Sequence, residues 1–378
     1  MFFAGFLCCL FCLFLVRVSN GGKCTTLSLP NAFSGLQKTF NSSVGTQVPF
    51  EAPEDVPYRR PDAVDTFADY KYRAACNISS QELHAPFSPL CQDRQSVLTA
   101  MSSGGRIGKD APFMPRGCDM RWFNTAEVCE ILSRFDRVII TGDSMMRHLI
   151  GSLNVLIRQD LGYGAVTDWN FSPDERKECF CNNQFNVKGC SVQGIYKTAD
   201  VMEHDPMSVA CDAGTINVAI EEIIRFPIPP DEIERFKTSL PSTKPNRPVA
   251  FVMGHGLWND LDLQASVNWL DKLMETTTIK MPWLNEPGAF FPRLMLTPNA
   301  AGIGKPTEWR ALQGNEALME FEESVKVEAA KRGVEHLGTW NMSAQASKYD
   351  GTHLDLRGNL VKGMMVMNWL NMLDVERY

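Results

Sequence analysis

From about residue 130 onward, short apolar runs alternate with stretches of helical periodicity, and this alternation restricts the fold more than any other feature of the sequence. The runs predicted to form strands are 137–140, 216–224, 249–253, 293–297 and 334–340, and the clearest helices are 316–332 and 356–373. For 216–224, Glu221 and Glu222 leave a helical start open. The alternation predicts an α/β fold, a three-layer α/β/α sandwich with a mainly parallel, doubly wound sheet.

The N-terminus indicates a targeting segment. Phe2 to Val16 is an almost unbroken apolar run, followed by Arg17. At ~1.5 Å per residue such a helix falls short of a bilayer core of ~30 Å. We therefore expect residues 1–20 to be a cleaved signal peptide, with a retained signal-anchor as the alternative. Either way the protein would enter the secretory pathway and be secreted or act in the Golgi lumen, and the mature chain would span no membrane unless the anchor is retained.

The cysteines agree with an oxidising compartment. Three of the 12 lie in the apolar run, and the other nine are Cys24, Cys76, Cys91, Cys118, Cys129, Cys179, Cys181, Cys190 and Cys211. We expect four disulfides with one cysteine left over, in a connectivity that the sequence leaves open. Cys179, Cys181 and Cys190 are spaced closely enough for a metal site, but no matched histidine pair or second C-x-x-C accompanies them, so we expect no metal. N-x-S/T sequons, which support a lumenal location, begin at Asn41, Asn77, Asn170 and Asn341.

Composition divides the chain into two parts and excludes one class of partner. Residues 21–130 are rich in Ser, Pro, Gly and Asn and are predicted to be an irregular, disulfide-tied segment before an α/β domain at 131–378. Hydrophobic content of 44% and charged content of 21% are typical of a globular protein. The net charge of −7, with no dense Lys/Arg stripe, argues against a nucleic-acid partner.

Reactive side chains follow the first and the last predicted strands. In a doubly wound sheet, groups at the carboxyl ends of the strands meet at one edge. Ser144 lies between a strand and a helix, where its backbone N–H can stabilise a developing oxyanion. His353 lies on a loop before the last helix, and Asp350 is three residues earlier, so the carboxylate can orient the imidazole. The pattern predicts Ser144 as nucleophile and the Asp350–His353 pair as its base.

Each of these signals also has an ordinary structural explanation. Gly-Asp-Ser at the start of a helix is a common turn with an N-cap, and Asp-x-x-His before a helix can be a capping carboxylate beside a solvated histidine. The occurrence of both, at the first and last strand ends of one sheet, favours the catalytic interpretation.

The motifs also resemble those of a known family. The stretch from Gly142 to Arg147 is similar to the GDSxxR signature of the PC-esterase branch of the SGNH superfamily, which includes the plant trichome-birefringence-like proteins. The upstream segment from Cys118 to Phe123 is similar to one in the plant members, and Asp350 and His353 match the superfamily's DxxH. The resemblance implies an SGNH-like catalytic domain at 131–378.

The family usually supplies further oxyanion donors, and here this chain departs from the pattern. The segment from Gly254 to Asp260 fits the third block imperfectly; its candidate donors are Asn259 first and His255 second, with Gly256 near the aligned position. Trp258 could serve there or pack in the core. For the second-block glycine the candidates are Gly189 and Gly194.

Arg147 lies one helical turn beyond Ser144 and could support the oxyanion or Asp143, or be a solvated helix cation. A segment similar to a phosphate-binding loop, Gly302 to Thr307, lacks the first glycine of that motif because Asn299 takes its place, and Pro306 interrupts the helix start. We expect no cofactor.

The resemblance implies a serine-dependent carbohydrate O-acyl esterase, with acetyl as the acyl group, acting on cell-wall or glycan substrates. One alternative is a polysaccharide O-acetyltransferase with the same triad. The other is a non-catalytic glycan-binding protein on the same scaffold, which the imperfect third block favours.

Overall fold

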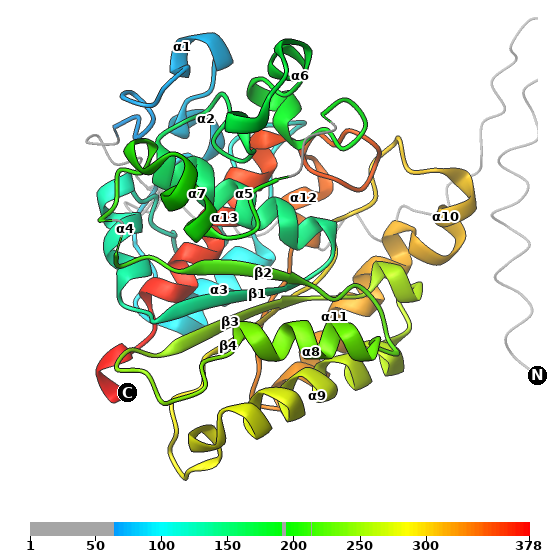
Figure 1. The fold of residues 1–378 in the computed structure, drawn as a ribbon. Coiled ribbons are helices and arrows are strands. Elements are labelled where there is room, and N and C mark those ends of the chain that lie inside the picture. Colours follow the sequence, from blue (N-terminus) through cyan, green and yellow to red (C-terminus); the bar gives the residue numbers. More distant parts are fainter. Residues whose placement is uncertain (1–63, 191–193, 213) are drawn as a thin grey trace, which may run out of the picture. The chain divides into compact units, whose positions relative to one another are not determined.

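The computed structural model describes residues 64–190, 194–212 and 214–378, and at its centre is a five-stranded sheet (Figure 1). The strands are β1 (Arg137–Gly142), β2 (Val218–Glu222), β3 (Val249–Gly254), β4 (Arg293–Leu296) and β5 (Glu335–Leu337). They lie in the order β2-β1-β3-β4-β5 and all pairs are parallel. This confirms the predicted α/β class and parallel sheet, with one strand in each expected run; the segment at 216–224 is a strand rather than a helical start.

Helices occupy most of the remaining described chain, including both long helices that periodicity predicted. In chain order they are α1 (Arg73–Cys76), α2 (Ser80–Leu83), α3 (Arg94–Ser103), α4 (Thr125–Ser133), α5 (Ser144–Arg158), α6 (Pro173–Glu178), α7 (Thr198–His204), α8 (Pro230–Ser239), α9 (Leu263–Lys280), α10 (Thr307–Gln313), α11 (Asn315–Lys331), α12 (Trp340–Ala344) and α13 (Leu356–Asn371).

Alternate side chains of each central strand enter two separate hydrophobic clusters. In β1, Val138 and Ile140 pack in one cluster and Ile139 packs in the other. The first cluster contains the apolar faces of α3, α4, α5 and α13, and the second contains those of α8, α9 and α11. Figure 1 shows these two groups of helices on opposite sides of the sheet. Burial on both faces explains why the strands read as continuous apolar runs.

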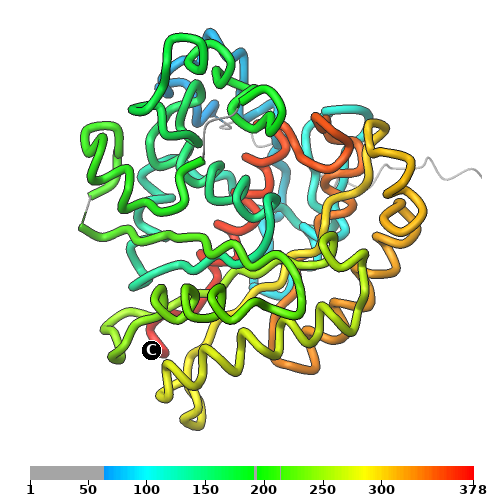
Figure 2. Tube along the Cα trace, turned by 45° about the vertical axis from the view of Figure 1, so that its right-hand side comes forward, coloured from blue at the N-terminus to red at the C-terminus, as the bar shows by residue number. Residues whose placement is uncertain are grey.

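The helices that follow the two predicted catalytic segments pack directly on each other. Figure 2 shows α13, in red, crossing the middle of the molecule beside the green α5. Gly363 of α13 faces Ser152 of α5 so closely that a Cβ at residue 363 would lie 2.7 Å from Ser152 Oγ. Since Ser144 begins α5 and His353 lies just before α13, this contact helps to set the distance between them.

Four disulfides tie the described segments together, as the cysteine usage predicted. The pairs are Cys76–Cys181, Cys91–Cys118, Cys129–Cys211 and Cys179–Cys190. The remaining cysteine, Cys24, lies outside the described residues, as do the predicted signal peptide and the sequon at Asn41. Within the described residues, no helix has the length and apolar character needed to cross a bilayer.

Residues 64–130 add side chains to the same core as the sheet. Phe67, Leu98, Met101 and Phe123 are buried in the cluster that also contains α5 and α13. The described part of this segment therefore packs on the α/β unit, and its predicted boundary near residue 130 falls inside α4.

The close approach of α5 and α13 makes a testable prediction. We expect Gly363→Ala to lower the free energy of unfolding in the wild-type background, because overpacking costs ~1–3 kcal/mol. In a Ser152→Ala background the nearest oxygen is gone, and the same change should be neutral or stabilising because alanine favours helix by about 1 kcal/mol over glycine. Urea denaturation of the four proteins measures the coupling. Equal effects of Gly363→Ala in both backgrounds would show that the contact is not tight.

Candidate active site

The sheet brings the predicted reactive segments to one edge. Strand order reverses between β1 and β3, and crevices at such switch points are where ligands bind in open α/β sheets. Ser144 follows β1 at this point, as the first residue of α5. Gly142 has a φ of 151°, and a Cβ there would lie 2.3 Å from Gly254 O of β3, so only glycine fits where the two strands end.

Three side chains form a continuous hydrogen-bonded chain. Ser144 Oγ lies 2.7 Å from His353 Nε2, and His353 Nδ1 lies 2.7 Å from Asp350 Oδ2. With the Nδ1 proton donated to the carboxylate, Nε2 is free to accept the serine proton. The side chains of His353 and Asp350 are 15% and 17% exposed, so solvent can reach these hydrogen-bonded side chains. The geometry is that of a nucleophile, a base and a group that orients the base.

Asp350 has a second role within its own loop. While Oδ2 contacts the imidazole, Oδ1 accepts hydrogen bonds from the backbone N–H groups of Thr352 (3.0 Å) and His353 (2.9 Å). Burial opposes ionisation of Asp350, but the hydrogen bonds from the His353 ring and from these two amides outweigh it and hold the carboxyl pKa well below its usual range. The carboxylate therefore stays charged when the imidazole takes up a proton.

The loop that carries the pair is held from several directions. Asn182 accepts a hydrogen bond from Leu356 N–H through Oδ1 and one from the Tyr349 hydroxyl through its backbone carbonyl. Asn299 Nδ2 donates to Thr352 O at 3.2 Å. Asn182 lies in the short 3-10 helix Cys181–Phe185 and Asn299 lies in the loop after β4, so distant parts of the chain fix the position of the base.

The phosphate-loop-like segment is a further clamp on this loop. Gly302 N–H donates to Gly351 O at 2.8 Å. Gly351 has a φ of +79°, and a Cβ there would lie 1.9 Å from the backbone nitrogen of Lys305. The glycines of the segment thus allow two backbones to approach closely, a use of glycine that we did not predict.

A buried lysine lies beneath the site. Lys362 of α13 is 2% exposed, and its Nζ donates to Asn299 Oδ1 at 2.6 Å. Burial lowers the pKa of Lys362 to about 7, although the nearby Asp143 carboxylate favours the charged form. Asp143 is 3% exposed and caps α5 by accepting a hydrogen bond from Met145 N–H. Burial also raises the pKa of Asp143. Lys362 was not predicted as a site residue; a lone lysine within the apolar face of the last helix is its only sequence signal.

The two predicted side-chain donors of the third block make hydrogen bonds to residues other than Ser144. The Asn259 amide both accepts from Phe226 N–H (2.8 Å) and donates to Phe226 O (2.7 Å), so its two polar atoms are engaged. His255 is buried among α9 side chains, with Nδ1 2.8 Å from Ser266 Oγ, and burial lowers its pKa to about 4.

Gly256 and Trp258, which lie beside these donors in the sequence, occupy different environments. Gly256 is packed so that a Cβ would lie 2.7 Å from the Phe321 ring. Trp258 is 57% exposed, so the core-packing alternative for it is wrong.

The first turns of α5 carry other polar groups. Arg147 donates to Glu222 Oε1 at 3.0 Å and to the Tyr196 hydroxyl at 3.2 Å, rather than to Asp143. The His148 ring lies 5.1 Å from the His353 ring, and burial lowers its pKa well below the usual value, so it stays neutral. Arg147, His148 and Gly194 line a cavity of about 160 Å³. Of the two second-block candidates, Gly194 therefore lies beside α5, whereas Gly189 faces Asn186.

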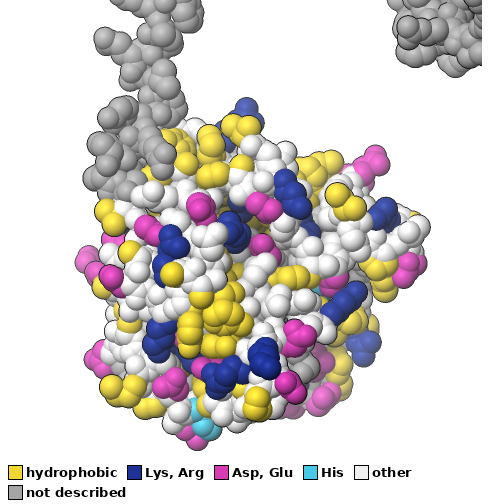
Figure 3. All heavy atoms as spheres, turned by 90° about the horizontal axis from the view of Figure 1, so that it is seen from above, with side chains coloured by type: hydrophobic (Ala, Val, Ile, Leu, Met, Phe, Trp, Pro, Cys, Tyr) yellow, Lys and Arg dark blue, Asp and Glu magenta, His cyan; other side chains and the backbone are white. Residues whose placement is uncertain are grey.

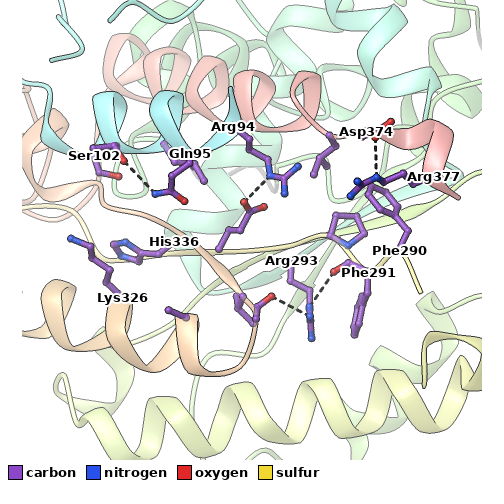
Figure 4. Close-up of a pocket in the computed structure, with 18 of the residues that line it drawn as sticks. Arg94, Gln95, Ser102, Phe290, Phe291, Arg293, Lys326, His336, Asp374 and Arg377 are labelled. Atoms are coloured by element: carbon purple, nitrogen blue, oxygen red, sulfur yellow. Dashed lines mark hydrogen bonds and ion pairs between the residues drawn. The ribbon is translucent and has the colours of Figure 1, made fainter. Parts of the chain in front are cut away.

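A larger cleft lies elsewhere. It has a volume of about 700 Å³ and runs along β5 between α3 and α11 (Figure 4). Four of its charged groups form ion pairs, Arg94 with Glu335 and Asp374 with Arg377. Ser144, His353 and Asp350 are not among the residues that line it.

Within the described residues, no group of three or more His, Cys, Asp or Glu side chains is placed to hold a metal ion. On the face shown in Figure 3, acidic side chains lie among the basic ones. That face therefore does not present the uniform positive charge that nucleic acid attracts.

Comparisons with known proteins are distant. No family model matches the chain, and no curated protein matches its sequence. Among solved structures, a carbohydrate acetylesterase from Sinorhizobium meliloti aligns over 61% of this chain and 96% of its own, with 16% identity and a TM-score of 0.30. A likeness this remote supports no statement about fold or activity, so the proposals below rest on the geometry of the site and on the motifs.

The clamp on the catalytic loop predicts an outcome for Gly351→Ala. The left-handed backbone at 351 and the contact with Lys305 both oppose a side chain, so we expect activity toward a small ester to fall by more than roughly tenfold, as the base moves out of reach. Gly288→Ala is the matched control, because Gly288 has the same φ of +79° but no atom within 4 Å of a Cβ. Similar losses in the two variants would mean that the clamp does not position the base.

Burial of Lys362 predicts a pH-dependent stability. The unfolded chain binds a proton at this residue below pH 10.5, but the folded chain does so only below about 7. Between these values the unfolded state binds more protons, so the wild-type free energy of unfolding rises with pH relative to Lys362→Met, by about 2 kcal/mol over about two pH units. Urea denaturation at several pH values measures this. Lys331→Met, at a side chain 62% exposed, should give a curve parallel to wild type; a parallel curve for Lys362→Met would contradict the prediction.

Proposed function

We propose that the protein is a serine esterase that removes acyl groups, acetyl above all, from carbohydrate hydroxyls. The observation that carries the proposal is the hydrogen-bonded chain from Ser144 Oγ through His353 to Asp350, with both contacts at 2.7 Å. Nucleophile and base come from opposite ends of the domain, 209 residues apart. A helix cap or a core contact would not require a serine, a histidine and an aspartate joined in this way, so the arrangement favours a catalytic role.

The mechanism follows from the geometry. Ser144 Oγ attacks the ester carbonyl carbon while its proton passes to His353 Nε2, and the tetrahedral oxyanion forms. Asp350 stabilises the imidazolium through Nδ1. The C–O bond to the sugar then breaks, and His353 returns the proton to the departing hydroxyl. Water attacks the acyl-serine in the second step and loses its proton to His353. The bond between the acyl carbon and Ser144 Oγ then breaks, His353 returns the proton to Ser144 Oγ, and the carboxylic acid is released.

The oxyanion is assigned to the start of α5. Ser144 is the first residue of that helix, so its N–H is one of the donors that the helix itself leaves without an acceptor. The positive end of the helix dipole lies at the same place. Asn259, our first candidate from the sequence, would have to release both hydrogen bonds to Phe226 to take part, so the Ser144 backbone is the primary donor in this proposal.

The substrate class and compartment rest on the motifs and the disulfides. GDSxxR and DxxH resemble those of the PC-esterase branch of the SGNH superfamily, with the triad positions at Ser144, Asp350 and His353. Helices on both faces of a parallel sheet agree with the three-layer SGNH arrangement. Four disulfides agree with folding in the secretory pathway.

The decisive measurement is acetate release from acetylated polysaccharide, with Ser144→Ala as the comparison. Loss of the nucleophile should lower turnover by a factor on the order of 10⁴ or more, since triad members act as a unit. A fluorophosphonate should label the wild-type serine, and neither Ser144→Ala nor His353→Ala should react. Ser103→Ala, at an exposed serine that ends α3 and belongs to none of the sequons, is the control and should be labelled like wild type.

The same assay separates the alternatives. Acetate release without an added sugar acceptor supports the esterase. Turnover only when an acceptor oligosaccharide is supplied, with acetylated oligosaccharide as product, would replace it with an acetyltransferase that uses the same triad. Absence of any Ser144-dependent change in both formats would leave the non-catalytic glycan-binding protein.

A further inference from the structure

Large apolar side chains are exposed beside the catalytic loop. Trp258, in the turn after β3, is 57% exposed, and Trp309, on α10, is 47% exposed. Leu312 of the same helix is 54% exposed, and Ile303 of the preceding loop is 97% exposed. Single exposed apolar residues are normal on a protein surface, but two tryptophans with two aliphatic neighbours in linked segments are not.

One side chain joins the two tryptophan-bearing segments. Gln313, at the end of α10, is buried, and its Nε2 donates to Leu257 O and to Asp260 Oδ1, both at 2.9 Å. These acceptors flank Trp258 on either side. Trp309 is four residues before Gln313 and so lies on the same face of α10. The buried Gln313 amide therefore links the turn that carries Trp258 to the helix that carries Trp309.

The same amide connects this surface to the catalytic loop. Lys305 is 4% exposed, and its Nζ donates to Gln313 Oε1 at 2.8 Å. Its backbone nitrogen is the atom against which Gly351 packs, one residue from Asp350. A short path of direct contacts thus runs from Asp350 through Lys305 and Gln313 to the turn that carries Trp258.

The turn is also anchored so that Trp258 projects outward. Its neighbour Leu257 is held by Gln313 through the carbonyl, and its other neighbour Asn259 is held by the Phe226 backbone through both amide atoms. A rigid turn that leaves an indole exposed lowers the entropic cost of ordering that indole on binding.

We infer that Trp258 and Trp309, with Ile303 and Leu312, form a platform that binds the sugar chain carrying the ester. This inference rests on the proposed function. Flat indole faces pack well against the C–H faces of pyranose rings, which are apolar and weakly polarised, while sugar hydroxyls remain in water. The contacts of Lys305 with Gly351 and with Gln313 favour this occupant, because they connect the segments that carry the platform to the loop that holds His353.

The test compares a polymeric with a minimal substrate. The ratio of kcat/KM for acetylated xylo-oligosaccharide to kcat/KM for p-nitrophenyl acetate should fall by roughly tenfold for Trp258→Ala and for Trp309→Ala, the loss expected for one stacked ring. The Trp→Tyr variants, which keep an aromatic face, should recover part of the ratio. Ile279→Ala, which removes an apolar side chain 69% exposed at the far end of α9, should keep the wild-type ratio.

Binding is measured separately from turnover in the Ser144→Ala protein. Titration with the same oligosaccharide should change tryptophan fluorescence, and the affinity should fall by roughly tenfold when either indole is removed. This arm is independent of catalysis. If no ester is turned over in a Ser144-dependent manner, the esterase proposal fails, while indole-dependent oligosaccharide binding would still support the platform.

Three results would overturn the platform. The first is an unchanged substrate ratio and unchanged oligosaccharide affinity in both alanine variants, with circular dichroism showing that they are folded. The second is an equal fall in the ratio for Ile279→Ala. The third is self-association of the wild type that Trp309→Ala abolishes without any change in oligosaccharide affinity, which would assign the surface to a second copy of the chain.

Discussion

The carboxylate of Asp350 makes the interaction on which the whole site depends. One oxygen holds the loop in shape by accepting hydrogen bonds from two backbone N–H groups. The other oxygen orients the His353 ring, which faces Ser144. The ionised Asp350 carboxylate therefore determines both the shape of the loop and the orientation of the His353 ring. The hydrogen bonds that lower its pKa also keep it charged throughout the physiological range. The surrounding contacts from Asn182, Asn299 and Gly302 then place this preformed unit against α5.

The sequence was informative where structure is local. Strand runs, the start of α5 and the spacing of Asp350 and His353 are each decided within a few residues, so periodicity and motif spacing were enough to predict them. Parallel strands share one carboxyl edge, which is why the two segments were expected to meet. Lys362 and Asn299 could not be found in this way, because their roles arise only when α13 and the loop after β4 pack together.

In the third block, Gly254 to Asp260, the side-chain positions also could not be predicted from the sequence. Its composition offers an amide, an imidazole and an indole after β3, and sequence alone cannot say which of them faces the serine. In the structure Asn259 turns to Phe226 and His255 turns to α9, while Trp258 remains at the surface. A change of one residue in the register of a short turn is enough to redirect every side chain in it, and motif alignment does not resolve that.

The distance along the chain between nucleophile and base, 209 residues, has a consequence for biosynthesis. Ser144 leaves the ribosome long before the segment that carries its proposed base, and α13 follows that segment. A nascent or C-terminally truncated chain would therefore hold an inert serine, and reactivity would arrive only when the final helix docks on α5. In the proposed mechanism, Ser144 could be acylated only after residue 353 has been made and α13 has packed on α5.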